Sequence, residues 1–365
     1  MIRAHAGRHA RMREGLATLG VALLVLATLS SGPGAASASS PAAGDGAGPG
    51  ESLGTKEEAE ALAAIRVSRL SAGDRYELGA AVALLTRPSG ADVVYVASGA
   101  NYPDALSAGP PAVVQGGVLL LTAPDAAPPS VLAALTRLNP RSVIVVGGES
   151  AVSSRVLGQL GAAAPRAVVG RLAGVDRYAV SRALAAQAFP AGADNVFVAT
   201  GTNFPDALSA VSPAAIYNSP VLLVDGGAPV ADSDTQRAIA AAAPSSLVIM
   251  GGVLSVSQGV MDTLSPSVES VRLGGADRYA VSSVVNDHFL ADFSTVYFAT
   301  GANFPDALVG GVLTGTRHNP LYIVPPGCVP RPVLSRLASK GTSEVVLLGG
   351  TASLTTAVEA LTPCP

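Results

Sequence analysis

Blocks of apolar and polar residues follow one another along the chain and predict alternating helices and strands. The pattern is clearest between residues 176 and 273. Val180, Leu184 and Ala188 recur at four-residue spacing, which predicts one apolar face of a helix over 176–189. Further helices are predicted over 204–217, 232–243 and 255–264. Short runs that are apolar throughout predict buried strands over 195–200, 220–224, 246–250 and 268–273.

The continuous apolar character of these runs indicates the fold class. Strands that are buried on both faces are typical of parallel sheets, and alternation with helices gives such sheets a helical layer on each face. We therefore expect an α/β fold in which each parallel sheet is covered by helices on both sides.

One sequence unit occurs three times, and this repetition predicts the domain organisation. Arg-Leu-x-x-x-Asp-Arg-Tyr spans 69–76, 171–178 and 272–279. Ala-Ser/Thr-Gly-x-Asn-Tyr/Phe-Pro-Asp-Ala-Leu spans 97–106, 199–208 and 299–308. An apolar residue and a Gly-Gly pair recur at 146–148, 250–252 and 348–350. We predict three modules over 66–167, 168–268 and 269–365, called copies one, two and three, each long enough for its own core.

The residues before the first module predict export. Four arginines precede an apolar run from Leu16 to Leu29, and Ala36-Ser37-Ala38 offers small residues at a cleavage position. This order is typical of a secretory signal peptide, here over 1–38, and the run is shorter than the roughly 20 residues of a membrane span. Residues 39–65 are predicted to be a flexible linker that ends in a short helix over 55–65.

The charge balance argues against a nucleic-acid partner. The whole chain has 23 Lys and Arg against 26 Asp and Glu, and loss of residues 1–38 would leave a net charge of −6. No basic patch large enough for nucleic acid is visible. Lys56 and Lys340 are the only lysines after residue 38, so any bound anion would be contacted chiefly by arginine.

Two arginines recur in every copy and form the first candidate site. Their planar guanidinium groups suit carboxylate and phosphate, often through two parallel hydrogen bonds. A salt bridge to a repeated Asp, within or between copies, is the alternative, and the two roles are compatible. The residues are Arg69, Arg75, Arg171, Arg177, Arg272 and Arg278.

The Asn-Phe-Pro-Asp turn is the second candidate. Asn203 is predicted to cap the following helix, with Pro205 in its first turn and Asp206 favourably placed near the helix dipole. The functional alternative places Thr200, Asn203 and Asp206 in a cleft at the carboxyl end of the sheet, where open parallel sheets bind ligands.

The sequence does not predict catalysis. The Gly-Gly pairs lack a complete Gly-x-Gly-x-x-Gly, and no Gly-Lys-Ser/Thr follows, so no nucleotide is expected. His288 and His318 lie outside the repeated motifs and are too few for a zinc amidase, so we expect no metal or other cofactor. Cys328 and Cys364 are the only cysteines, and in an exported chain we expect them to form a disulfide that ties down the C-terminal tail.

The recurring motifs resemble those of the cell wall binding repeat 2 family, from residue 69 to about 361. The family's Pro-Ile-Leu-Leu motif corresponds to Pro220-Val-Leu-Leu223, so the resemblance implicates Pro220, Leu222 and Leu223 in polymer binding. It also implies three modules packed around a pseudo-threefold axis. Copy one has Gly117 in place of the proline, and copy three reads Pro320-Leu-Tyr-Ile323, so a full site is best supported in copy two.

The resemblance implies a function at the surface of Gram-positive bacteria. We expect a secreted, non-catalytic protein that binds an anionic wall polysaccharide or teichoic-type polymer without a covalent bond. A self-assembling surface-layer protein and the targeting part of a wall amidase system are the alternatives. Trp is absent and Phe and Tyr total 15, so charged hydrogen bonds are expected to matter more than stacking on sugar rings.

Overall fold

The computed structural model describes residues 56–365, so the predicted signal peptide and most of the predicted linker lie outside the described residues. The short helix expected before the first module is α1 (Lys56–Ala63). It packs against α13 (Arg331–Ser339), and Ser335 donates a 2.6 Å hydrogen bond to Glu58.

Twelve strands form three four-stranded sheets in the described part of the chain, and every pairing is parallel. The first sheet contains, in spatial order, β3 (Val118–Thr122), β2 (Val93–Ser98), β4 (Ser142–Val146) and β5 (Val168–Leu172). The second contains β7 (Val221–Val224), β6 (Asn195–Thr200), β8 (Ser246–Met250) and β9 (Glu269–Leu273). The third contains β11 (Leu321–Val324), β10 (Thr295–Thr300), β12 (Glu344–Leu348) and β1 (Arg66–Leu70). The expected α/β class is confirmed.

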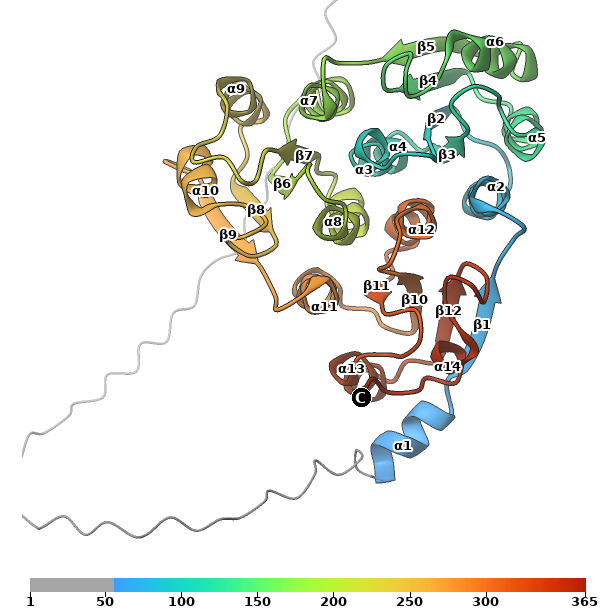
Figure 1. Ribbon diagram of the computed structural model, residues 1–365, viewed down its shortest axis with the longest axis vertical. Coiled ribbons are helices and arrows are strands. Elements are labelled where there is room, and N and C mark those ends of the chain that lie inside the picture. Colours follow the sequence, from blue (N-terminus) through green and yellow to red (C-terminus); the bar gives the residue numbers. More distant parts are fainter. Residues whose placement is uncertain (1–55) are drawn as a thin grey trace, which may run out of the picture. The chain divides into compact units, whose positions relative to one another are not determined.

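The sheets exchange strands between copies. β5 and β9 open copies two and three in the sequence, yet each completes the sheet of the preceding copy. The strand β1, from copy one, completes the sheet of copy three in the same way. It pairs with β12 from Arg66 opposite Glu344 to Leu70 opposite Leu348. Figure 1 shows this pairing as the blue strand beside the red one. No copy therefore completes its sheet alone.

Three kinds of helix recur around the sheets. Those that follow the Asp-Arg-Tyr motif are α2 (Arg75–Thr86), α7 (Arg177–Ala188) and α11 (Arg278–Phe289). Those that follow the Asn-Tyr/Phe-Pro-Asp motif are α3 (Pro103–Leu106) with α4 (Gly109–Val114), α8 (Pro205–Ile216) and α12 (Pro305–Arg317). The outer faces carry α5 (Pro129–Leu138), α6 (Ser154–Ala163), α9 (Ser233–Ala242), α10 (Gln258–Leu264), α13 and α14 (Thr356–Glu359).

The helix predicted over 255–264 begins three residues late. The hydroxyl of Ser257 accepts a hydrogen bond from the Val260 amide and caps α10 there. Copy one also differs from the other copies, because its axial helix is divided into α3 and α4. Pro110 and Pro111 cannot donate main-chain hydrogen bonds, which is consistent with a new helix beginning at Gly109.

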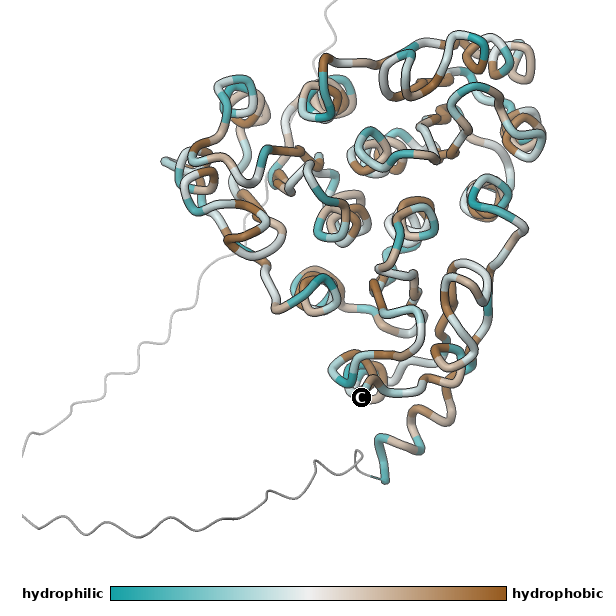
Figure 2. Tube along the Cα trace, in the orientation of Figure 1, coloured by the Kyte–Doolittle hydropathy of each residue, from teal (hydrophilic) through white to brown (hydrophobic). Residues whose placement is uncertain are grey.

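The axial helices α4, α8 and α12 pack against one another in all three pairs, which gives the expected pseudo-threefold arrangement (Figure 1). The inner face of each sheet contributes to one central core that includes Leu106, Leu208 and Leu308. The outer faces have three separate cores, one for each sheet. Figure 2 shows apolar residues gathered along the strands. Close helix packing requires small residues, since a Cβ on Gly311 would lie 2.7 Å from a methyl group of Val211.

Candidate functional site

The repeated motifs meet at the carboxyl ends of the strands. In copy two, Arg177 donates a hydrogen bond to the Gly201 carbonyl, and a Cβ on Gly201 would lie only 2.6 Å from the Tyr178 ring. Gly201 is therefore required by the aromatic ring that covers it. The same contacts join Arg75 and Tyr76 to Gly99, and Arg278 and Tyr279 to Gly301.

Each of these helix arginines, Arg75, Arg177 and Arg278, also reaches the neighbouring copy. Their guanidinium carbons lie 5.9, 5.9 and 5.6 Å from the ring centres of Phe304, Tyr102 and Phe204 respectively. These separations fall within the range of cation–π attraction. Every helix arginine thus links the strand end of its own copy to an aromatic residue of another.

The three aromatic residues form a cluster of their own. The ring centres lie 5.4 Å apart for Tyr102 and Phe204, 5.8 Å for Tyr102 and Phe304, and 6.1 Å for Phe204 and Phe304. The Tyr102 hydroxyl donates a 3.0 Å hydrogen bond to the Thr202 carbonyl. Sequence reasoning missed this cluster, although the signal was present as the aromatic position of the Asn-Tyr/Phe-Pro-Asp motif.

Two of the repeated aspartates, Asp104 and Asp306, lie close to helix arginines. Burial raises the pKa of the Asp104 carboxyl, and the positive charge of Arg177 counteracts this shift. Burial likewise raises the pKa of Asp306, while a hydrogen bond from Ser353 and the charge of Arg75 lower it. Both arginines belong to a different copy from the carboxylate. The junctions of copies one and two and of copies one and three therefore each place a cation beside a partly desolvated acid.

The aspartates also explain the Gly-Gly pairs. The first glycine of each pair has a positive φ, +101° at Gly147, +92° at Gly251 and +104° at Gly349, which favours glycine. A Cβ at any of them would collide with the carboxylate of Asp104, Asp206 or Asp306 respectively.

The strand arginines, Arg69, Arg171 and Arg272, have a different environment. Arg171 donates hydrogen bonds to the carbonyls of Gly147 at 2.8 Å, Gly148 at 3.0 Å and Val152 at 2.7 Å. Arg272 bonds the carbonyls of Gly251 and Val256, and Arg69 bonds the Gly349 carbonyl and pairs with Glu359 at 3.0 Å. These side chains brace the loop after the third strand. Among residues 56–365 neither arginine set forms the alternative salt bridge to a repeated Asp.

A cleft of about 360 Å³ opens where copies two and three meet. Thr200, Asn203 and Asp206 line it from copy two, and Arg278 lines it from the start of α11. The Thr200 hydroxyl hydrogen bonds that of Thr202 at 2.8 Å. On the rim, the side chain of Leu254 is 98% exposed, which is unusual for a large apolar residue. The structure therefore brings three turn residues and one arginine of the sequence hypothesis into one cleft.

The predictions for Asn203 and Pro205 at the start of α8 had different outcomes. Pro205 occupies the first turn of α8, as predicted, but Asn203 does not cap the helix. The chain is already helical at Phe204, and the Asn203 side chain reaches only the adjacent Phe204 amide, at 2.9 Å. Asp176 does cap α7, by accepting a hydrogen bond from the Ala179 amide.

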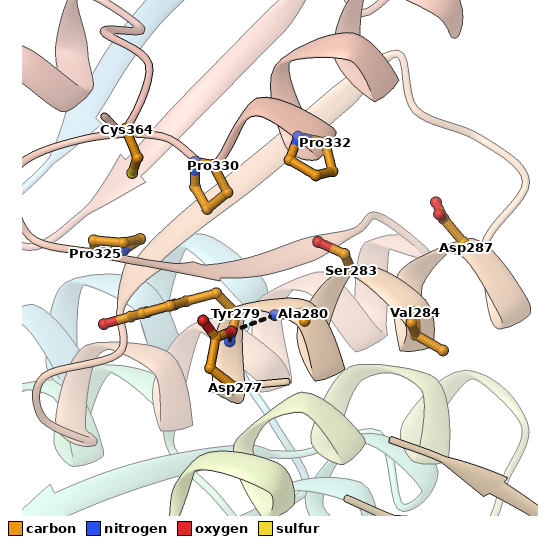
Figure 3. A pocket seen from close by; sticks show the side chains of 10 residues that line it. All are labelled: Asp277, Tyr279, Ala280, Ser283, Val284, Asp287, Pro325, Pro330, Pro332 and Cys364. Carbon is orange, nitrogen blue, oxygen red and sulfur yellow. Dashed lines mark hydrogen bonds between the residues drawn. The ribbon is translucent and has the colours of Figure 1, made fainter. Parts of the chain in front are cut away.

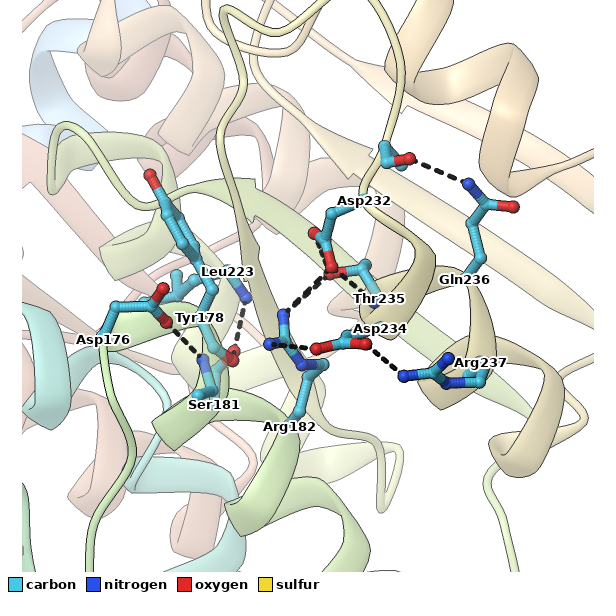
Figure 4. A network of polar contacts seen from close by, with 12 residues as sticks. Asp176, Tyr178, Ser181, Arg182, Leu223, Asp232, Asp234, Thr235, Gln236 and Arg237 are labelled. Carbon is cyan, nitrogen blue, oxygen red and sulfur yellow. Dashed lines mark hydrogen bonds and ion pairs between the residues drawn. The ribbon is translucent and has the colours of Figure 1, made fainter.

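Pro220, Leu222 and Leu223 are buried, with 1% or less of Leu222 and Leu223 exposed. Leu223 lies on edge strand β7, where its amide donates a 3.0 Å hydrogen bond to the hydroxyl of Ser181 on α7 (Figure 4). Any effect of these residues on binding must therefore act through the strand and helix that they hold in place.

The outer helices differ between copies two and three. Arg182 on α7 donates a hydrogen bond to Thr235 at 3.1 Å and pairs with Asp232 and Asp234 at the start of α9 (Figure 4). Ser283 occupies the equivalent position on α11, and there a groove of about 580 Å³ separates α11 from the β11–α13 segment. Figure 3 shows Asp277 and Tyr279 on one side of this groove and Pro325 and Pro330 on the other.

The predicted disulfide is present. Cys328 and Cys364 are bonded, with their Cα atoms 4.9 Å apart, and the bridge joins the C-terminal tail to the segment after β11. It closes a loop that is worth about 3–4 kcal/mol in the chain-entropy model. Among the described residues, none of the helices has the length and apolar character needed to cross a membrane.

These features define a class of protein built from tandem α/β repeats that share a central core, with a cleft where copies two and three meet. The chain belongs to the family of cell wall binding domain 2, CWB2, whose model matches residues 69–157, 171–261 and 272–359. The resemblance inferred from the motifs is confirmed. Membership of this family implies association with the cell wall or cell surface.

Two curated relatives come from Bacillus subtilis (strain 168). The chain is 29% identical over 300 residues to N-acetylmuramoyl-L-alanine amidase LytC, a match that covers 82% of this chain and 58% of the amidase. It is 25% identical over 291 residues to the amidase enhancer, covering 80% of this chain and 39% of that protein. The matched region is thus less than two thirds of either relative.

Two solved structures share the fold. Cwp6 from Clostridium difficile superposes with a TM-score of 0.72 at 24% identity, over 82% of this chain and 48% of Cwp6. Cwp8 from the same organism gives the same TM-score at 22% identity, over 81% of this chain and 51% of Cwp8.

Proposed function

We propose that this protein is a secreted, non-catalytic wall-binding protein that holds an anionic wall polymer in the clefts between its copies. The observation that carries the proposal is the cleft between copies two and three, where Arg278 meets the strand-end turn of copy two. Secretion by the predicted signal peptide and attachment to Gram-positive walls are part of the same proposal, and so are the module boundaries at 167/168 and 268/269.

The hydrogen bonding of Arg278 supports a role in ligand contact. Only its Nη1 donates, to the Gly301 carbonyl at 2.6 Å, so Nη2 and Nε have no hydrogen-bond partner within residues 56–365. Hydrogen bonds from such a charged donor to an anion contribute about 1.5–3 kcal/mol each. The start of α11 faces the same cleft through Asp277 and Arg278. Equivalent arginines in all three copies would add avidity on a repeating polymer.

The absence of catalysis is proposed on the histidine environment. His288 is exposed on α11 and His318 is exposed just after the end of α12, and the described residues contain no group of three His, Cys, Asp or Glu side chains placed to hold a metal ion. Clearing of wall material embedded in a gel by the purified protein would contradict this part of the proposal.

The binding proposal is tested with isolated Gram-positive walls before and after chemical removal of their anionic polymers. The mature protein should sediment with intact walls, bind much less to stripped walls, and dissociate as salt rises, because exposed charge pairs are screened. Equal binding to stripped walls would contradict polymer recognition. Large assemblies in light scattering without wall material would favour the surface-layer alternative.

A role as the targeting part of a wall amidase system is the second candidate, favoured by similarity to an amidase and to an amidase enhancer. Addition of the mature protein to a wall amidase and its substrate would then change the rate of wall lysis. An unchanged rate, with wall binding intact, would leave attachment as the function.

A further inference from the structure

Copy one has a cavity of about 480 Å³ at the end of its sheet opposite the clefts. Its wall is formed by the segments that lead into the strands, at residues 87–92, 116, 137–141 and 166. Four arginines from these segments line it, together with one acid, Asp92. The arginines are Arg87, Arg137, Arg141 and Arg166.

The positive charge of this cavity is largely uncompensated. Arg141 pairs with Asp92, at 3.3 Å between Nε and Oδ1. Over residues 56–365, Arg87, Arg137 and Arg166 have no carboxylate partner within 4 Å and no side-chain hydrogen bond. The Nε of Arg87 is buried and has no hydrogen-bond partner within residues 56–365, which is costly for a polar atom unless a water or a ligand supplies an acceptor.

The four arginines are specific to copy one. Counted from the ends of the corresponding helices and strands, the equivalent residues are Phe189, Ala241, Ser245 and Ser267 in copy two, and Leu290, Ala338, Ser343 and Ala64 in copy three. Copies two and three form this end of the sheet without arginine at these positions, so the fold does not require the four arginines. Helix dipoles do not account for the group either. Arg87 and Arg137 lie at helix C-termini, where cations are favoured, but Arg141 and Arg166 precede strands.

We propose that this cavity is a second anion site that takes a phosphate-bearing group, separate from the wall-binding clefts. The four guanidinium groups, which come from three segments, can each donate two hydrogen bonds to the oxygens of a multiply charged phosphate. The volume lies within the range of small-molecule sites and accommodates a phosphorylated sugar or a polymer end. The outer, amino end of copy one thereby gains a specificity that copies two and three lack.

The test measures binding of inorganic pyrophosphate to the mature protein by calorimetry at constant ionic strength. The parent should bind with saturation, and Arg137→Gln/Arg166→Gln should bind at least tenfold more weakly. Arg155→Gln/Arg331→Gln is the matched control, because both residues are exposed, lie outside the cavity and remove the same charge. The absence of saturable binding, or equal weakening in both double variants, would overturn the proposal.

A second measurement identifies the source of the phosphate. If the cavity variant loses pyrophosphate binding but keeps its affinity for intact walls, the site serves a free phosphorylated ligand. If wall affinity falls with it, the site receives phosphate groups of a wall polymer. The cleft variant Arg278→Ala separates the two proposals, since it should retain pyrophosphate binding whatever its effect on walls. Loss of pyrophosphate binding in folded Arg278→Ala would place the anion in the cleft and overturn the separate site.

Discussion

The strand arginines and the helix arginines recur equally well in the sequence, six residues apart, yet their surroundings differ. Arg171, on a strand, uses both terminal nitrogens on three main-chain carbonyls of its own sheet. Arg177, on a helix, donates through Nη1 alone and faces Tyr102 and Asp104 of another copy. The first set holds a loop together, whereas the second lies at a junction and has donors available.

Recurrence within a chain therefore does not separate folding from binding. A residue that braces the same loop in each copy repeats as regularly as one that contacts the same ligand. The number of donors already used inside the protein is the physical quantity that distinguishes the two sets. Four substitutions test the comparison, in order of decreasing expected effect.

Arg171→Ala should cost the most stability. It removes three charge-assisted hydrogen bonds and leaves the carbonyls of Gly147, Gly148 and Val152 without that donor. We expect a loss of about 3 kcal/mol in the free energy of unfolding, measured by urea denaturation. Arg155→Ala, an exposed arginine on α6 at the outer face of the same sheet, is the control. A loss below about 1 kcal/mol would contradict the bracing role.

Gly251→Ala should disturb both arginine environments at once. Gly251 has φ +92°, accepts a hydrogen bond from Arg272 and abuts the carboxylate of Asp206. The unfavourable backbone conformation alone costs roughly 1–2 kcal/mol, and displacement of Asp206 adds to it. Gly252→Ala, beside it and with open space at its Cβ, should be much milder in the same denaturation experiment. Equal effects would show that the Asp206 contact is unimportant.

Arg278→Ala should leave the protein folded and weaken wall binding about tenfold, or roughly 1.4 kcal/mol. It removes a donor from the cleft between copies two and three, with one main-chain hydrogen bond and one cation–π contact as the structural loss. Cosedimentation with walls measures the effect, and circular dichroism checks the fold. Arg237→Ala, on the outer surface of copy two, should bind as the parent does. If Arg278→Ala binds equally well, helix arginines are structural too.

The sequence predicted the elements well because the central strands of each sheet are almost entirely apolar and are separated by helices with an apolar face. Asn195–Thr200 and Ser246–Met250 were predicted to the residue. It did not predict that β1 completes the last sheet, since Arg66, Ser68 and Arg69 dilute its apolar pattern and its partner lies 278 residues away. The aromatic cluster and the arginine cavity depend on contacts between distant segments, which no local pattern contains.

Asp104→Asn should have the smallest effect of the four substitutions, and it should raise the free energy of unfolding instead of lowering it. Burial raises the pKa of Asp104 above its value in the unfolded chain, so the folded state binds the proton more readily. Stability from this group is therefore present at low pH and is lost as pH rises through the raised pKa. Asn keeps the shape without the charge, so the variant should be slightly more stable than the parent at pH 7, with no gain well below the pKa of an ordinary Asp.

The same substitution affects the junction between copies one and two, where Arg177 lies beside Asp104. Loss of the carboxylate leaves the charge of Arg177 less compensated, so wall binding at pH 7 should strengthen modestly. Denaturation midpoints of parent and variant at several pH values, with cosedimentation at pH 7, measure both effects. Lower stability of Asp104→Asn at pH 7 would mean that the attraction between Asp104 and Arg177 outweighs the cost of burying the carboxylate. The helix arginines would then resemble the strand arginines, because their main role would be to stabilise the fold and not to bind a ligand.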